Sequence, residues 1–167
     1  MTVRLPQRTA AISRILIALV VLVASAAACD LTAPENEWDQ HSQRLARNRA
    51  RWHGQGLQSY SYVMSKACEC IPYFEAPSRA SVEGAVVIGV QRIGDGEMVA
   101  EELWSCWDTV EGLFDFVAHA IEEQAAFLEV EYDPVRGFPT RIAVGLWEHL
   151  VDDEMLALVS DFTVPGF

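Results

Sequence analysis

Between residues 108 and 144, the spacing of apolar residues changes from the period of a helix to the period of a strand. Apolar side chains first recur three or four positions apart, at Val110, Leu113, Phe114, Val117 and Ile121. From Leu128 to Tyr132 they alternate with acidic residues, as in a half-buried strand. Asp133–Gly137 has the Pro and Gly of a tight turn, and Thr140–Val144 predicts the returning strand. The pattern therefore predicts a helix packed over an antiparallel hairpin.

The first half of the chain predicts a similar succession of elements. A helix begins at Glu35 or Asn36 and ends at Gly54 and Gly56. A long strand is predicted over Leu57–Ile71, and its side chains on one side are Tyr60, Tyr62, Met64, Lys66, Cys68 and Cys70. The next two strands are predicted at Arg79–Glu83 and Ala85–Ile93.

The remaining segments complete the predicted fold. Met98–Trp107 is interpreted as a connecting loop. Met155–Val164 is interpreted as a last strand, with one side formed by Leu156, Leu158, Phe162 and Val164. The predicted fold class is α+β: two helices packed on one antiparallel sheet, in αβββ-αβββ order, after an N-terminal signal peptide.

The N-terminus has the order of a secretory signal. Arginines 4, 8 and 14 precede an uncharged run, Ile15–Cys29, that ends in small residues. Its apolar stretch is shorter than the roughly 20 residues that a spanning helix needs, although a retained anchor helix is the alternative. Ala26-Ala27-Ala28-Cys29 resembles the lipobox of bacterial lipoproteins, in which the cysteine becomes the lipid-modified first residue.

These features predict a domain organisation and a location. We expect a lipoprotein signal peptide over residues 1–28, a tether over 29–36 and a single α+β domain over 37–167. The domain would be held by a lipid on Cys29 at the extracytoplasmic face of the bacterial cell envelope.

The charge of the chain limits its partners. Loss of residues 1–28 removes three arginines and takes the net charge from −12 to −15. Such a domain is repelled by phosphate backbones and by anionic lipid headgroups, so nucleic acid is not an expected partner. The basic patch of the first helix is formed by Arg44, Arg47, Arg49 and Arg51. It could be a solvated helix face, pair with the acidic strands or face a membrane surface.

The cysteines are the main candidates for chemistry. If Cys29 carries a lipid, Cys68, Cys70 and Cys106 remain, in an oxidising compartment. A disulfide from Cys106 to Cys68 or Cys70 would be a structural staple. The alternatives are a strained, redox-active Cys68–Cys70 pair and a metal site, but the four histidines have no ligand spacing relative to the cysteines. We predict no bound metal and no cofactor.

Other candidate groups each have an ordinary interpretation. Asp152, Asp153 and Glu154 could bind a cation but fit a solvated turn better. Asp115 and His119, one helical turn apart, could be an acid–base pair or a surface salt bridge. Trp104, Trp107 and Trp147 could line a groove or fill a core. No catalytic residue is predicted, because the chain contains no nucleophile or phosphate-binding motif.

Several segments resemble one bacterial family. They are LQSYSYVMSKACEC, VEGAVV, TVEGLFDFVAHAI, VEYDPVRGFPTRIAV and DDEMLALVSDF. Together they are similar to the domain-of-unknown-function 6174 family of secreted proteins and lipoproteins, from about Arg51 to Phe162. The resemblance implies fold and location but no activity.

We therefore expect a non-enzymatic envelope lipoprotein that binds a protein or peptide and is attached to the membrane through Cys29. The alternative is a thiol-redox or metal-dependent envelope factor using Cys68, Cys70 and Cys106. A hydrolase is a third hypothesis.

Overall fold

The computed structural model describes residues 36–67, 76–145 and 154–165. The described elements belong to one compact unit, Glu37–Phe167. In chain order they are α2 (Glu37–His53), β1 (Ser59–Ala67), β2 (Ser78–Glu83), β3 (Val86–Arg92), the 3₁₀ helix η2 (Glu101–Cys106), α3 (Val110–Glu122), β4 (Phe127–Tyr132), β5 (Pro139–Gly145) and β6 (Glu154–Thr163).

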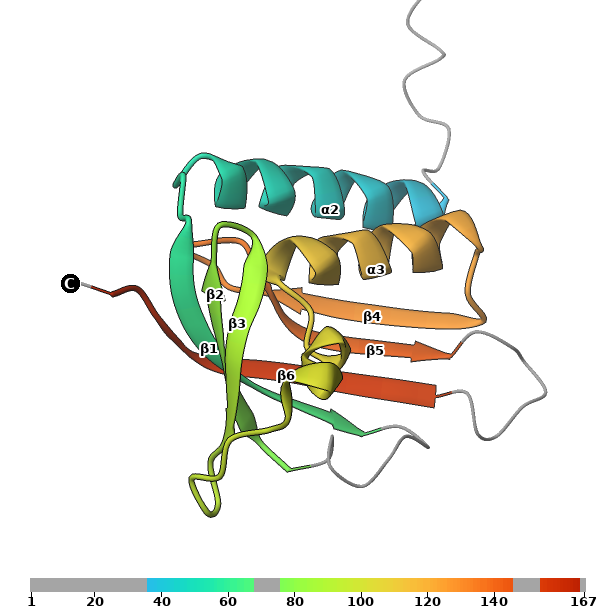
Figure 1. Ribbon diagram of the computed structural model, residues 1–167. Helices are drawn as coiled ribbons and strands as arrows, with labels where there is room; N and C mark the ends of the chain where they lie inside the picture. Colours follow the sequence, from blue (N-terminus) through green and yellow to red (C-terminus); the bar gives the residue numbers. More distant parts are fainter. Residues whose placement is uncertain (1–35, 68–75, 146–153, 166–167) are drawn as a thin grey trace, which may run out of the picture. The chain divides into compact units, whose positions relative to one another are not determined.

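The six strands form one antiparallel sheet in the order β3-β2-β1-β6-β5-β4. The first and last strands, β1 and β6, therefore pair at its centre and join two three-stranded meanders. Helices α2 and α3 run side by side along one face of the sheet (Figure 1). Within the part of the chain that is described, no helix is long and apolar enough to cross a bilayer.

The predicted fold, two helices on a sheet in αβββ-αβββ order, is wrong. The described residues contain three helices, because η2 stands between β3 and α3. We had interpreted Met98–Trp107 as a loop, since six residues of 3₁₀ helix are too short to show an apolar period. The helix is held by tertiary contacts: Trp104 Nε1 donates to the carbonyl of Val99 at 3.0 Å, and Leu103 packs against the core.

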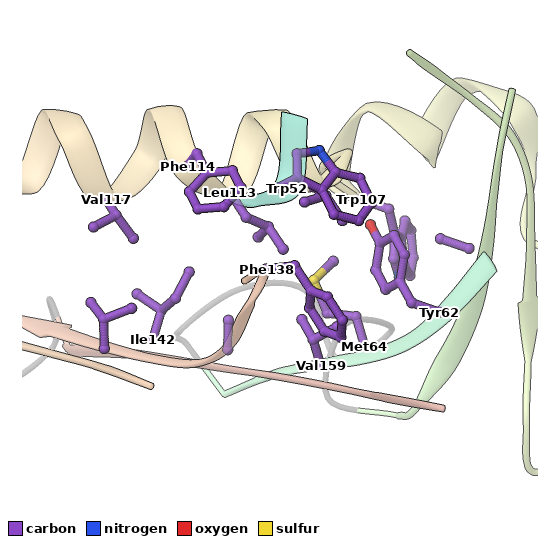
Figure 2. Close-up of a cluster of buried hydrophobic side chains, with 14 of the residues drawn as sticks. Trp52, Tyr62, Met64, Trp107, Leu113, Phe114, Val117, Phe138, Ile142 and Val159 are labelled. Carbon is purple, nitrogen blue, oxygen red and sulfur yellow. The ribbon is translucent and has the colours of Figure 1, made fainter. Parts of the chain in front are cut away.

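Helix α3 forms where the apolar spacing predicted it. The Oγ1 atom of Thr109, its N-cap, accepts from the backbone N–H of Gly112 at 3.1 Å. The predicted apolar stripe of α3 is buried, and Figure 2 shows Leu113, Phe114 and Val117 directed toward the sheet. Leu128 and Val130 of β4 are buried in the same core. Packing of this helix over the β4–β5 hairpin is confirmed.

The predicted orientation of β6 is wrong in part. Its pairing with β1 is irregular between Ser61 and Val63, and Asp161 in β6 has a φ of 46°. Across this bulge Phe162 turns into the core, whereas Leu158 remains 43% exposed. Simple alternation predicts Leu158 and Phe162 on the same face of β6. The one extra residue in the bulge places them on opposite faces.

Candidate functional site

A cluster of aromatic side chains closes the core where α2 ends. Trp52, in the last turn of α2, has edge-on contacts to Tyr60 and to Phe162, with ring centroids 5.2 and 5.7 Å apart. Phe162 also stacks on Phe138 at 4.8 Å. Trp52 is 6% exposed, so the cluster is a rigid apolar floor under this end of the domain.

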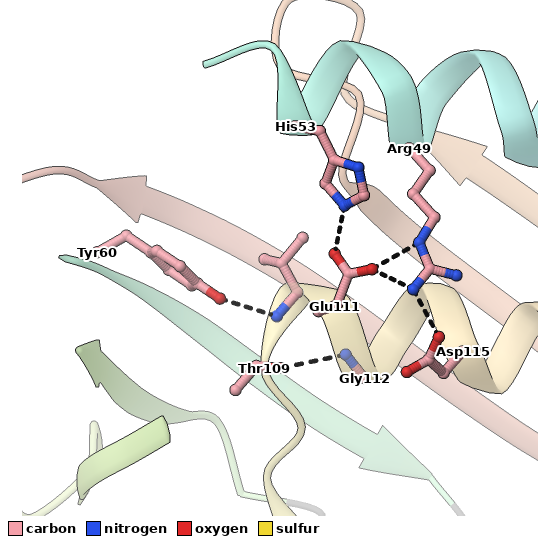
Figure 3. Close-up of polar contacts among 8 residues, drawn as sticks. Arg49, His53, Tyr60, Thr109, Glu111, Gly112 and Asp115 are labelled. Atoms are coloured by element: carbon pink, nitrogen blue, oxygen red, sulfur yellow. Dashed lines mark hydrogen bonds and ion pairs between the residues drawn. The ribbon is translucent and has the colours of Figure 1, made fainter. Parts of the chain in front are cut away.

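A polar cluster lies beside it, between α2 and α3 (Figure 3). Glu111, in the first turn of α3, accepts from Arg49 Nε at 2.5 Å through Oε1 and contacts His53 Nε2 at 2.9 Å through Oε2. The Nη2 atom of Arg49 also pairs with Asp115 at 2.7 Å. Arg49 and His53 are four residues apart on α2, and Glu111 and Asp115 are four residues apart on α3. The two pairs thus face each other between the helices.

The charge of Arg49 is stabilised by this arrangement. Partial burial favours the neutral guanidine, but the hydrogen bonds of Asp115 and Glu111 and their negative charges outweigh it and raise the pKa of Arg49. The arginine is therefore a permanent cation between two carboxylates.

The N-terminus of α3 is fixed by two buried tyrosines of β1. The hydroxyl oxygen of Tyr60 accepts from the backbone N–H of Val110 at 3.0 Å, and the hydroxyl of Tyr62 donates to the carbonyl of Asp108. Burial raises the pKa of both phenols, so both remain protonated at neutral pH. These bonds hold Glu111 in register with His53.

Two open hollows are both lined by Leu57, and the first of them is also lined by His53 and Glu111 of the polar cluster. The first has a volume of about 350 Å³ and is lined by Trp52, His53, Gly56, Leu57, Gln58, Tyr60, Ala85, Thr109 and Glu111. The second has a volume of about 390 Å³ and is lined by Gln55, Leu57, Arg136, Phe162, Thr163 and Val164. We call the two together the Leu57 groove. The guanidinium of Arg136 lies 5.2 Å from the centre of the Phe162 ring.

The lining of the Leu57 groove suits the binding of a ligand better than it suits catalysis. Both carboxylate oxygens of Glu111 already have partners. The hydroxyls of Thr109 and Tyr60 accept hydrogen bonds from backbone N–H groups of α3. Its lining offers an apolar floor and a few polar edges, which suit recognition.

Most cysteines proposed from the sequence lie outside the described residues, namely Cys29, Cys68 and Cys70. Cys106 is half-buried at the end of η2 and forms no disulfide with a described residue, and its carbonyl accepts from Lys66 Nζ at 2.9 Å. The staple from Cys106 to Cys68 or Cys70 stays a prediction. No three potential metal ligands gather within the described ranges.

The other proposed groups are separated by the fold. Asp115 pairs with Arg49 of the neighbouring helix, and no contact joins it to His119. Trp107 is buried in the core, and Trp104 packs against it. Residues 147, 149, 152 and 153 fall outside the described ranges, as does the side chain of Glu154.

The sequence analysis missed the polar cluster between the helices. The arginines of the first helix were expected to pair with acidic strands or to face solvent or a membrane, yet Arg49 pairs with α3. The signal was present, because Arg49 and His53 are four residues apart, as are Glu111 and Asp115. Only the antiparallel packing of the two helices brings the pairs together.

Comparison with known proteins identifies a family but no activity. Neither the curated proteins nor the solved structures gave a match. The sequence model of a family of unknown function, DUF6174, matches residues 44–164, which is more than half of the chain and includes the Leu57 groove and the polar cluster. The chain therefore belongs to the DUF6174 family.

Proposed function

We propose that this protein is a lipid-anchored envelope protein that binds a protein or peptide in the Leu57 groove. The observation that carries the binding role is the pair of hollows that are both lined by Leu57. Each is large enough for one or two side chains, so an extended peptide could place successive side chains on either side of Leu57.

The surroundings of the groove support binding over chemistry. Trp52, Tyr60 and Phe162 supply rigid aromatic surface beneath it, the kind of surface that dominates recognition sites. His53 and Arg136 stand at its edges, and the guanidinium of Arg136 can donate hydrogen bonds to a ligand. The tyrosine and threonine bonds to the start of α3 keep the walls in place before a ligand arrives.

A photo-crosslinking amino acid at Leu57 tests the binding role in native membranes. Val86 is the control position, because it is 61% exposed and lies outside the groove. We expect one adduct from position 57 and none from position 86. The purified partner should then bind the purified protein, and Leu57→Asp should weaken binding at least about tenfold while Val86→Asp does not. Equal effects of the two variants would refute the groove.

The anchor is supported by the leader and by the lipobox-like segment ending at Cys29. The intact mass of the protein purified from membranes tests it directly. We expect a chain that begins at Cys29 and carries lipid. An unmodified Cys29, or a chain that still contains residues 1–28, would refute the anchor.

A further inference from the structure

Three arginines of α2 form one exposed row. Arg44, Arg47 and Arg51 are spaced by three and four residues and are exposed, whereas Trp52, the next residue along the helix, is buried. We call these three residues the arginine stripe. Residues 44–51 also contain Arg49, but that side chain points to α3 and is neutralised there.

The stripe meets no carboxylate within the described part of the chain. Arg44 donates to the carbonyl of Val130 at 3.1 Å. Arg51 donates to Asn48 Oδ1 at 3.2 Å and to the carbonyl of Pro134 at 3.4 Å. Arg47 makes no hydrogen bond or ion pair to any described residue. Among the described residues these three cations have no carboxylate partner, in a chain with 24 acidic and 12 basic residues.

The hydrogen bonds of the arginine stripe orient its side chains and leave most of their N–H donors available. Arg44 and Arg51 are tied to backbone carbonyls of β4 and of the β4–β5 turn, so their side chains lie along one edge of the domain. A guanidinium has five N–H donors, and these bonds occupy one or two of them. The remaining donors can make paired hydrogen bonds to phosphate oxygens.

We propose that the arginine stripe docks on anionic phospholipid headgroups of the membrane that holds Cys29. The proposal rests on the lipid anchor proposed above. Cys29 precedes Glu37, the start of α2, by eight residues. Even a fully extended chain of that length spans less than about 29 Å, so the tether keeps α2 close to the bilayer surface.

Charge determines which surface of the domain faces the lipid. The body of the domain is acidic and is repelled by an anionic membrane, whereas the stripe is attracted once it comes within a Debye length of about 8 Å. An arginine near an anionic surface favours binding about fivefold, so three favour the docked orientation about a hundredfold. The domain would therefore lie with the edge that carries the arginine stripe, beside β4 and the β4–β5 turn, on the bilayer.

Arginine footprinting on vesicles tests the proposal with the full-length protein. The protein is purified from membranes with its lipid and reconstituted into vesicles of phosphatidylcholine alone or with about 30% phosphatidylglycerol. An arginine-specific dicarbonyl is added, and the modified residues are identified by mass spectrometry. Arg79 is the internal control, because, like Arg44, it donates to a backbone carbonyl, that of Asp161 at 3.4 Å, and it has no ion pair with a described residue.

We expect Arg44, Arg47 and Arg51 to react at least about tenfold more slowly on anionic than on neutral vesicles, with Arg79 unchanged. Salt at about 0.5 M should remove the protection. Equal rates on both vesicles would overturn the proposal, as would protection by soluble polyglutamate without protection by vesicles, which would indicate an acidic protein partner.

Sedimentation with neutral vesicles separates this proposal from the anchor. Protein that sediments with neutral vesicles is anchored, and its arginine rates then report on the stripe alone. If the protein does not sediment with neutral vesicles, the anchor proposal fails. In that case sedimentation with anionic vesicles still tests the stripe. The stripe is supported if sedimentation is lost in the triple variant Arg44→Gln/Arg47→Gln/Arg51→Gln but kept in Arg79→Gln. The stripe proposal is overturned if the protein does not sediment with anionic vesicles.

Discussion

The contact between Gly137 and α2 predicts that Gly137→Ala destabilises the domain more than an ordinary turn substitution. Gly137 ends the β4–β5 turn with a φ of +86°, in the left-handed region. A Cβ atom at this position would lie 2.5 Å from the carbonyl oxygen of Asn48 and 3.2 Å from Cβ of Arg51. The substitution therefore strains the turn and also pushes it against α2.

The two costs can be estimated separately. A left-handed conformation costs an L-residue about 1–2 kcal/mol. Forcing extra volume between packed elements costs about 1–3 kcal/mol. The helix backbone cannot rotate away as a flexible side chain can, so both costs apply at Gly137. The free energy of unfolding should fall by about 2–5 kcal/mol, a large fraction of a typical total of about 5–15 kcal/mol.

Gly84→Ala is the matched control. Gly84 has a φ of +56°, but a Cβ atom there meets nothing within 4 Å. The free energy of unfolding of Gly84→Ala should fall only by the cost of the left-handed conformation. Alanine also lowers the entropy of the unfolded chain, but this effect is common to both variants and cancels in the comparison. Urea unfolding followed by tryptophan fluorescence gives both free energies. An equal loss in the two variants would refute the close contact between the turn and α2.

Two further predictions concern the tyrosines and the cysteines. Burial raises the pKa of Tyr60, Tyr62 and Tyr132, that of Tyr132 to about 12, so the folded protein keeps protons that the unfolded chain releases above a pH of about 10.0. The free energy of unfolding should therefore be fully retained below that pH and fall as the pH rises toward about 12, and it should fall less steeply in Tyr132→Phe. Urea unfolding at a series of alkaline pH values measures this free energy. A free energy that does not change over this pH range would contradict the prediction. The predicted staple from Cys106 to Cys68 or Cys70 leaves one free thiol in the lipidated protein and three after reduction. A thiol assay that finds three in the native state would show the staple to be absent.

Elements whose determinants are local could be predicted from the sequence. Helix α3 follows from its apolar spacing, and the β4–β5 hairpin follows from alternation and from Gly137. Elements that depend on distant contacts were missed. The helix η2 has no periodicity of its own and depends on the packing of Leu103 and Trp104, and the bulge at Asp161 leaves no signature in the alternation of β6.

The same distinction applies to the candidate site. The Leu57 groove combines residues from the end of α2, the start of α3, the β4–β5 turn and the end of β6. Arg49 and Glu111 are 62 positions apart, so no local pattern brings them together. Within α2, however, Arg49 and Arg47 occupy different faces: Arg49 pairs with the carboxylates of α3, whereas Arg47 makes no ion pair with a described acid. The helical period thus divides one run of arginines into a structural ion pair and a cationic surface that meets no carboxylate of the described ranges, which is why the run could not be interpreted as a single patch.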